Sequence, residues 1–392
     1  MSAEIVIVSA KRTPLGAFQG VLAPVSASQL GSTAAKAAVE AAGIRVADVQ
    51  EVILGCVLPA GLGQAPARQA AIGAGIPPAT PATTINKMCG SGLKAVMMAA
   101  DQIRAGGTEV VLAGGFESMT RAPYLLPKAR AGYRLGHGEV VDHMFLDGLQ
   151  SPFDGKLMGC FADTTAAKYG LTREQQDAFA AESVRRATAA MEGAFDAEIA
   201  PVTIKGRKGE STVARDETPG TCDVSRIPSL RPAFGKDGTV TAASASSIAD
   251  AAAALVVMSG AAARSLGVKP LARILAQASH AQEPEWFTTA PVGATRKVLA
   301  RLGWQPRDVD LYEINEAFAA VTMTAMQELE LDHAKVNVNG GACALGHPLG
   351  ATGARILTTL LHALHHRGGK RGIASLCIGG GEAVAVAVEM IA

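Results

Sequence analysis

The chain has 392 residues, of which 48% are hydrophobic, 18% are charged and only 4% are aromatic, and its formal net charge is +1. This length and apolar content predict a globular protein of two or three domains with a large buried core. The near-zero charge gives no field that would attract nucleic acid, and without a run of about 18 apolar residues we expect neither a signal peptide nor a membrane span.

Helices and buried strands alternate in the first part of the chain. A helix ends at Gly43, a residue suited to the left-handed C-cap, and a short apolar strand, Glu51–Gly55, follows it. Pro66 occupies the first turn of the next helix, and a further helix runs over Ala95–Ile103. An apolar strand, Val110–Gly115, comes next. Because these strands lack the alternation of a half-exposed sheet, we expect them to be buried between layers of helices.

The middle of the chain, residues 119–249, has a different composition, rich in glycine, proline and charge. It contains one clear helical pattern, Arg173–Met191, with Thr172 as the N-cap and Gln175 completing a capping box. The segment Ile204–Glu210 is typical of a hairpin or an exposed loop. We interpret this region as an insertion, and insertions of this length often provide binding surfaces.

The last part of the chain repeats the pattern of the first. A helix with Pro291 in its first turn ends at Gly303, and the apolar strand Leu311–Ile314 follows. A later helix opens at Gly353 and leads to another apolar strand, Ile373–Gly380. The order and the spacing of these signals match those of the first part.

This repetition predicts an α/β fold that contains a duplicated α/β unit, in which two similar layered α/β/α halves carry an inserted loop domain. The N-terminal half covers residues 1–118 plus 250–269, the inserted domain covers 119–249, and the C-terminal half covers 270–392.

Three glycine-rich motifs contain the residue types of covalent catalysis. Cys89 comes just before the helix that includes Ala95, His347 lies in Gly346–Pro348, and Cys377 precedes three glycines. The N–H groups and the dipole at a helix start favour a thiolate, so we expect a lowered pKa for Cys89. The six cysteines are scattered without a Cys-x-x-Cys pair, which predicts neither a metal site nor a disulfide framework and is typical of the cytoplasm. Two thiols and one imidazole among glycines predict a covalent enzyme.

Six long motifs in a fixed order resemble those of the thiolase family, specifically its acetyl-CoA acetyltransferase branch. The resemblance covers nearly the whole chain, from Ile5 to Glu389, and the duplicated unit with its insert also fits that family's architecture. The motifs are Asn86–Gly92, Gly114–Met119, Asn315–Ala319, Asn337–Ala342, Gly346–Pro348 and Cys377–Gly381.

The resemblance implies a role for each of five residues. Cys89 would take the acyl group as a thioester, and His347 would draw its proton. Cys377 would be the acid/base that removes the α-proton of acetyl-CoA. Asn315 would hold a water that shares one oxyanion hole with His347, and the backbone N–H groups of Cys89 and Gly379 would form a second hole. Cys377 can act as a base if its pKa is lowered toward the working pH, an effect we expect from His347 and the glycine N–H groups.

The resemblance also places coenzyme A along the inserted domain, at a domain interface. Leu157 stands where many family members have His and cannot donate a hydrogen bond. We therefore expect a changed polar contact near the thioester and a changed acyl preference. The expected substrate and CoA contacts are Leu149, Leu157, Met158, Phe234, Ser246, Ala317 and Phe318.

The expected reaction, one of fatty acid metabolism, interconverts two acetyl-CoA with acetoacetyl-CoA and free CoA. These thioesters are substrates, and no cofactor is implied. Family members are usually tetramers built from dimers, so we expect a cytoplasmic homotetramer, with Tyr124–His143 as a candidate contact or CoA-facing loop.

Three alternatives stay open. The first is a 3-ketoacyl-CoA thiolase that cleaves longer chains. The second is a condensing enzyme that uses carrier-bound malonyl groups, although such enzymes usually have a second His where this chain has Cys377. The third is a non-catalytic thiolase-like CoA or lipid binder, against which the presence of Cys89, Asn315, His347 and Cys377 argues.

Overall fold

Two half-sheets with the same strand order form the core of the computed structural model, which describes residues 4–206 and 209–391. The N-terminal order is β1-β10-β5-β3-β4 and the C-terminal order is β11-β14-β13-β12. In each half the first two pairings are antiparallel and the third is parallel. In the C-terminal half, an isolated parallel β-bridge between Tyr312 and Val336 takes the position that β4 occupies in the N-terminal half. The predicted duplicated α/β unit is confirmed.

The two half-sheets are joined along β1 and β11, which pair through only two residues of each strand. The N-terminal strands are β1 (Ile5–Arg12), β2 (Gly16–Ala17), β3 (Glu51–Gly55), β4 (Ala82–Ile85), β5 (Val110–Ser118) and β10 (Ala249–Ser259). The C-terminal strands are β11 (Ala272–Ala281), β12 (Leu311–Ile314), β13 (Arg371–Ile378) and β14 (Glu382–Met390).

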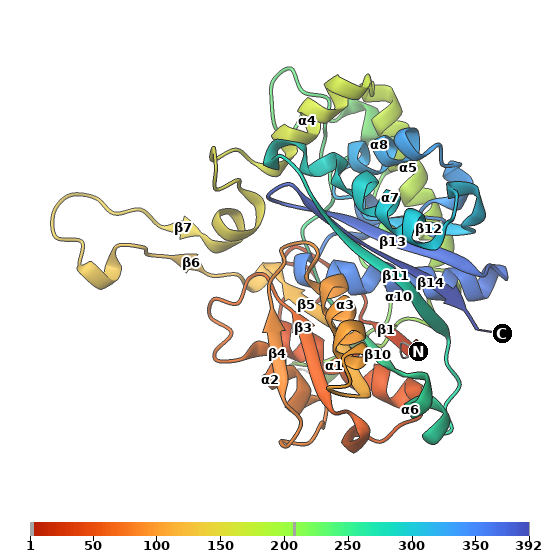
Figure 1. Ribbon diagram of the computed structural model, residues 1–392. Helices are drawn as coiled ribbons and strands as arrows, with labels where there is room; N and C mark the ends of the chain where they lie inside the picture. Colours follow the sequence, from red (N-terminus) through yellow and green to blue (C-terminus); the bar gives the residue numbers. More distant parts are fainter. Residues whose placement is uncertain (1–3, 207–208, 392) are drawn as a thin grey trace.

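Helices and half-sheets alternate in five layers (Figure 1). The outer helices of the N-terminal half are α1 (Ala27–Ala42) and α2 (Pro66–Gly73), and those of the C-terminal half are α7 (Ala290–Leu302) and α8 (Ala319–Leu329). Two helices, α3 (Ser91–Arg104) and α10 (Leu349–Arg367), lie between the half-sheets and share one apolar core with both. The short helices α6 (Gly260–Ser265) and α9 (Ala342–Leu345) complete the halves. None of the helices in the described residues is long and apolar enough to cross a membrane.

The central helices approach each other closely at two glycines that the sequence repeat makes equivalent. A Cβ on Gly92 would come within 2.7 Å of the Ala354 backbone nitrogen, and a Cβ on Gly353 would overlap the backbone of Leu93. Every residue from Leu349 to Leu361 is buried, as expected for a helix covered on all sides. This crossing brings the starts of α3 and α10 together, directly after the Cys89 and His347 motifs.

The inserted region contains two helices and an arm, residues 124–142, that projects from the body (Figure 1). The arm includes the short antiparallel pair β6 (Tyr124–Leu125) and β7 (Val141–Asp142). The helices are α4 (Met158–Tyr169) and α5 (Arg173–Ala190). The predicted hairpin is formed by β8 (Val202–Gly206) and β9 (Gly209–Val213), while residues 207 and 208 of that prediction lie outside the described residues.

Several local predictions are confirmed. Gly43 and Gly303 cap their helices with φ of 68° and 65°, and Pro66 begins α2. Thr172 and the Gln175 side chain form the predicted capping box of α5. The expectation of one helix in the insert is incomplete, because α4 is a second one. The domain boundaries stay predictions.

Candidate active site

Cys89 lies on a tight turn between β4 and α3. The preceding residue, Met88, has a φ of 47°, a left-handed conformation that side chains other than glycine rarely adopt. The Met88 N–H donates to Asn86 Oδ1 at 2.9 Å, and the Ser91 hydroxyl donates to the Met88 carbonyl at 2.6 Å. The Lys87 N–H donates to that same hydroxyl oxygen at 2.8 Å. These hydrogen bonds hold the turn in a conformation that would otherwise cost about 1–3 kcal/mol.

The surroundings of the Cys89 thiol are apolar. Val57 and Leu349 belong to the cluster against which Cys89 packs, and Leu149 lies in the same cluster. Burial raises the pKa of Cys89 from an ordinary value of 9.0 to about 11, although the N–H groups of Gly379 and of Cys89 itself act in the opposite direction. The expected lowering of this pKa is wrong for the free protein, because desolvation of the thiolate outweighs the two donors.

His347 is held as a neutral imidazole in one tautomer. Its Nδ1 lies 2.6 Å from Thr352 Oγ1, and that hydroxyl donates its hydrogen to the Pro348 carbonyl at 2.9 Å. Thr352 can then only accept from His347, so Nδ1 carries the hydrogen and Nε2 carries the lone pair. Burial lowers the pKa of His347 to about 3, and the charge of Arg355 acts in the same direction. The buried Nε2 has no hydrogen-bond partner within the described residues, so it can accept a proton.

Cys377 and Asn315 lie at the ends of neighbouring strands. The Asn315 N–H donates to the Ser375 carbonyl at 3.0 Å, two residues before Cys377. Both polar atoms of the Asn315 amide are buried without a partner in the part of the chain that the structure describes. Buried amides ordinarily have partners, so this one is suited to hold a substrate or an ordered water.

The thiol of Cys377 is fully buried. Burial raises the pKa of Cys377 well above its ordinary value, and the neighbouring Cys89 adds to the effect. The expected lowering of the Cys377 pKa is therefore also wrong for the free protein. A thiolate at this position would be scarce but strongly basic.

Donors from both halves of the fold meet at the Cys89 sulfur. One is the N–H of Cys89 itself, and the other is the N–H of Gly379, in the turn between β13 and β14. Gly380 and Gly381, the next residues of that turn, have φ of 94° and 91°, a conformation that favours glycine. Two preorganised donors at a nucleophilic sulfur can stabilise the oxyanion that forms when the sulfur attacks a carbonyl.

An apolar wall surrounds Cys377. Four of the expected CoA contacts belong to it: Met158, Phe234, Ala317 and Phe318. Phe234 meets Phe318 edge to face, with ring centroids 5.8 Å apart. The Ser246 N–H donates to the Ala317 carbonyl at 3.0 Å, which brings a fifth expected contact to the same wall.

The two remaining expected contacts are not part of this wall. Leu149 packs with Cys89 in the other cluster. Leu157 is the N-cap residue of α4, is half-buried and forms an antiparallel bridge with Gln150. It precedes Met158 directly, so it stands at the edge of the wall.

Sequence reasoning did not single out Glu117, a buried carboxylate beneath the site. Its oxygens accept from the N–H groups of Val57, Leu58 and Gly350 at 2.9, 3.1 and 2.9 Å. Gly350 is the second residue of α10, so the carboxylate caps that helix and ties it to the loop after β3. Burial raises the pKa of Glu117 to about 7. The sequence signal that could have identified Glu117 is its place in the motif Gly114–Met119.

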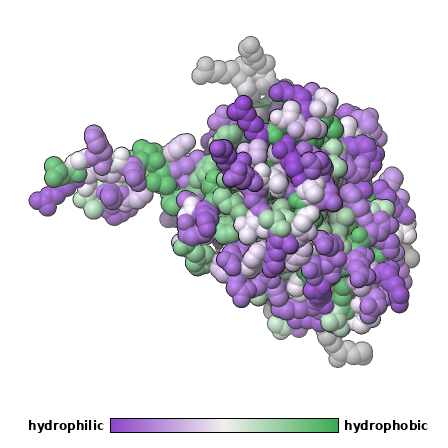
Figure 2. Space-filling model, turned by 90° about the horizontal axis from the view of Figure 1, so that it is seen from above, coloured by the Kyte–Doolittle hydropathy of each residue, from purple (hydrophilic) through white to green (hydrophobic). Residues whose placement is uncertain are grey.

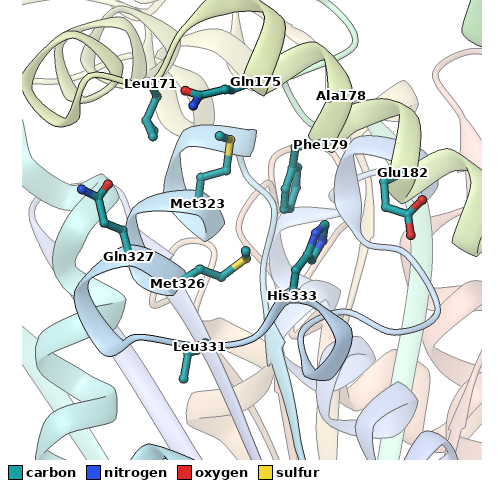
Figure 3. Close-up of a pocket in the computed structure, with 10 residues that line it drawn as sticks. All are labelled: Leu171, Gln175, Ala178, Phe179, Glu182, Met323, Met326, Gln327, Leu331 and His333. Atoms are coloured by element: carbon teal, nitrogen blue, oxygen red, sulfur yellow. The ribbon is translucent and has the colours of Figure 1, made fainter.

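A separate surface pocket of about 540 Å³ lies between α5 and α8 (Figure 3). Phe179 of α5 and His333 stack there with ring centroids 5.1 Å apart, and Met323 and Met326 of α8 line the floor. The pocket is lined by none of the expected site residues, so it is distinct from the site around Cys89. Residues 4–206 and 209–391 contain no group of three or more His, Cys, Asp or Glu side chains that could hold a metal ion.

Two family models match consecutive parts of the chain. The thiolase N-terminal domain matches residues 5–261, and the thiolase C-terminal domain matches residues 268–390. The chain belongs to the thiolase family. The resemblance of its motifs to that family is thereby confirmed.

Relatives of this thiolase match it over almost its whole length. It is 51% identical to the acetyl-CoA acetyltransferases of Cupriavidus necator and of Escherichia coli, in each case over 98% of this chain and 99% of the relative. It is 50% identical to acetyl-CoA acetyltransferase 2 of Arabidopsis thaliana, over 99% of this chain and 97% of the relative. The crystal structure of the Bacillus anthracis acetyl-CoA acetyltransferase matches with a TM-score of 0.97 at 43% identity, covering 100% of this chain and 99% of the other.

Proposed function

We propose that this thiolase is an acetyl-CoA C-acetyltransferase that interconverts two acetyl-CoA with acetoacetyl-CoA and free CoA. Relatives with that name share about half of its residues over nearly the full chain. The observation that carries the chemistry is the meeting of two backbone N–H groups at the Cys89 sulfur, beside a second buried thiol, Cys377.

In the first half-reaction, Cys89 Sγ attacks the thioester carbonyl of acetyl-CoA. The sulfur–carbon bond forms as the Cys89 proton passes to His347 Nε2, the free lone pair of the imidazole. The N–H groups of Cys89 and Gly379 stabilise the carbonyl oxygen as it becomes negative, and one such donor typically contributes a factor of about 10²–10³ in rate. The bond to the CoA sulfur then breaks, and that sulfur takes the proton from His347.

In the second half-reaction, His347 accepts the proton of Cys377. The resulting thiolate removes an α-proton from a second acetyl-CoA, and the carbanion attacks the acetyl group on Cys89. The imidazolium and a water held by the Asn315 amide stabilise the enolate oxygen. The Cys89 sulfur leaves and recovers its proton from His347, so that both thiols and the imidazole return to their neutral forms. The high pKa of Cys377 suits this step, because a weakly acidic α-proton needs a strong base.

The preference for a short acyl chain is part of the proposal. A Cβ on Gly379 would lie 3.5 Å from Met158 Sδ, so the Met158 side chain comes close to one of the two N–H donors. Together with Phe234 and Phe318 it limits the space beside Cys377. This favours an acetoacetyl substrate over the longer 3-ketoacyl chains.

The projecting arm is the proposed tetramer contact. Its apolar side chains are unusually exposed, with Tyr124 at 67%, Leu135 at 97% and Val140 at 62%. Figure 2 shows the arm extending away from the body, with hydrophobic residues along it and where it joins. Apolar side chains exposed together commonly mark a protein interface. We propose that these arms join two dimers in a homotetramer.

The proposed chemistry uses side chains and CoA thioesters alone, without a further cofactor. It needs Cys89 and Cys377 as thiols, and all six cysteines of the structure are free. A reducing compartment such as the cytoplasm suits that requirement.

The test is mass spectrometry of the intact protein after brief exposure to acetyl-CoA, followed by peptide mapping. A single acetyl group on the peptide that contains Cys89 is expected, and Cys89→Ala should acquire none. Cys222→Ala is the matched control, because that half-buried thiol lies outside the site and its loss should leave the adduct unchanged. Acetylation that persists in Cys89→Ala would remove Cys89 from the mechanism.

A further inference from the structure

Lys87 and Glu382 form an ion pair between the two loops that shape the site. Lys87 stands two residues before the nucleophile Cys89, and Glu382 begins β14 directly after the Gly379–Gly381 turn. The Lys87 ammonium donates to Glu382 Oε2, and the two side chains are 31% and 34% exposed. The pair therefore lies at the rim of the site and not in its interior.

Each partner is fixed firmly to one N–H donor of the site. The Lys87 carbonyl accepts from the Gly90 N–H at 3.0 Å, and the Lys87 backbone forms a bridge with Cys89. Glu382 pairs with Ile378 across the glycine turn that contains Gly379. A shift of Lys87 is thereby transmitted to the Cys89 N–H, two residues away. A shift of Glu382 is transmitted through its pairing with Ile378 to the adjacent Gly379 N–H.

Apart from the Gly379 N–H at the Cys89 sulfur, few other contacts hold these loops together. Gly90 packs against Ile378 so closely that a Cβ there would overlap its Cδ1 atom, which is a contact without directional preference. Lys87–Glu382 is the sole salt bridge between residues 86–90 and 377–382 within the described parts of the chain. The relative position of the Cys89 and Gly379 donors depends on how the loops dock, so a directional contact between the loops has a direct effect on the oxyanion hole.

We propose that the Lys87–Glu382 ion pair is a positioning device that sets the distance between the Cys89 loop and the Gly379 turn. Its effect falls on the rate of acyl transfer and not on CoA binding. The inference rests on the acyl transfer through Cys89 proposed above. Neither residue touches the reacting atoms in this account, and each acts through the backbone donor beside it.

A charge-swap cycle tests the proposal. The rate of acetyl-enzyme formation and its half-saturating acetyl-CoA concentration are measured for wild type, Lys87→Glu, Glu382→Lys and the double variant. Each single variant should acetylate about 3- to 10-fold more slowly, because the attraction between the two loops is lost and repulsion between like charges replaces it. The double variant should recover to within about twofold of wild type, with half-saturation changed less than twofold throughout. Raising the salt concentration from 0.05 M to 0.5 M should bring the acetylation rates of the single variants closer to that of wild type, because exposed charges are screened.

A matched control is the Arg296–Glu328 pair, which joins α7 to α8 at 2.9 Å with 56% and 34% exposure. Its charge swap should leave acetylation unchanged. Thermal unfolding of every variant checks that the fold persists. Two results would overturn the proposal. The first is a double variant whose loss of acetylation rate is the sum of the two single losses, without recovery. The second is a weakened acetyl-CoA affinity confined to the Lys87 variants, which would make Lys87 a substrate contact. Because all rates are compared with wild-type acetylation, a wild type that forms no adduct would instead refute the proposed function.

Discussion

The raised pKa of Cys89 leads to two different pH dependences for the same sulfur. With a pKa of about 11, roughly 0.1% of the thiol is ionised at pH 8. Alkylation by iodoacetamide proceeds through the thiolate, so its rate at Cys89 should rise about tenfold per pH unit from pH 7 to pH 10 without a plateau. Acetylation by acetyl-CoA starts instead from the neutral thiol and a neutral His347, whose pKa is about 3. Both forms dominate from pH 6 to pH 9, so we expect the acetylation rate to vary less than about threefold there.

The two rates are measured on one protein preparation by quenched-flow and peptide mass spectrometry, which separates Cys89 from the other five thiols. Cys89→Ser identifies the peptide, and a free cysteine peptide calibrates the reagent. A plateau of the alkylation rate at or below pH 8.5 would mean that Cys89 rests as a thiolate. In that case the apolar cluster around Val57 and Leu349 does not control its ionisation, and the reasoning from burial fails.

Three further outcomes are expected. Cys377→Ala should still acquire the acetyl label on Cys89 but lose condensation by a factor of at least about 10³; normal turnover would exclude Cys377 as the base. Leu157→His should change the ratio of kcat/KM between acetoacetyl-CoA and longer 3-ketoacyl-CoAs more than it changes acetylation, and an unchanged substrate profile would show that Leu157 lies outside the acyl pocket. Glu117→Gln leaves at least one of three buried N–H groups without an acceptor, so urea unfolding should show a loss of about 1–3 kcal/mol; a loss below 0.5 kcal/mol would mean that the tie to α10 contributes little.

Features that depend on a few adjacent residues could be predicted from the sequence. Gly43 adopts the left-handed cap because its own lack of a side chain decides the conformation, and the Thr172 capping box needs only residues within one turn. By contrast, α4 was missed because its N-cap, Leu157, makes no side-chain capping bond that a pattern could reveal. The position of Cys89 just before the start of a helix depends on one motif and could be predicted in the same way.

The electrostatics of the site could not be predicted, because burial there comes from distant parts of the chain. The cluster around Cys89 combines Val57, Leu149 and Leu349, and no local pattern indicates that these residues meet. A helix start alone suggests a thiolate, whereas the assembled cluster favours the thiol. The same distance in sequence hides the role of Glu117, whose three partners lie at positions 57, 58 and 350.

The hydrogen bonds behind His347 have a consequence for where protons can travel. Its Nδ1 hydrogen points to Thr352, whose hydroxyl donates to the Pro348 carbonyl, and a backbone carbonyl cannot pass a proton onward. The described residues thus provide no relay from the back of the imidazole to solvent. In the proposed mechanism, a hydrogen that His347 takes from a sulfur therefore leaves through Nε2. In the proposed reaction, each hydrogen that His347 carries moves between two of three sulfurs, those of Cys89, Cys377 and CoA, whereas the α-hydrogen of acetyl-CoA passes to Cys377 without entering the imidazole.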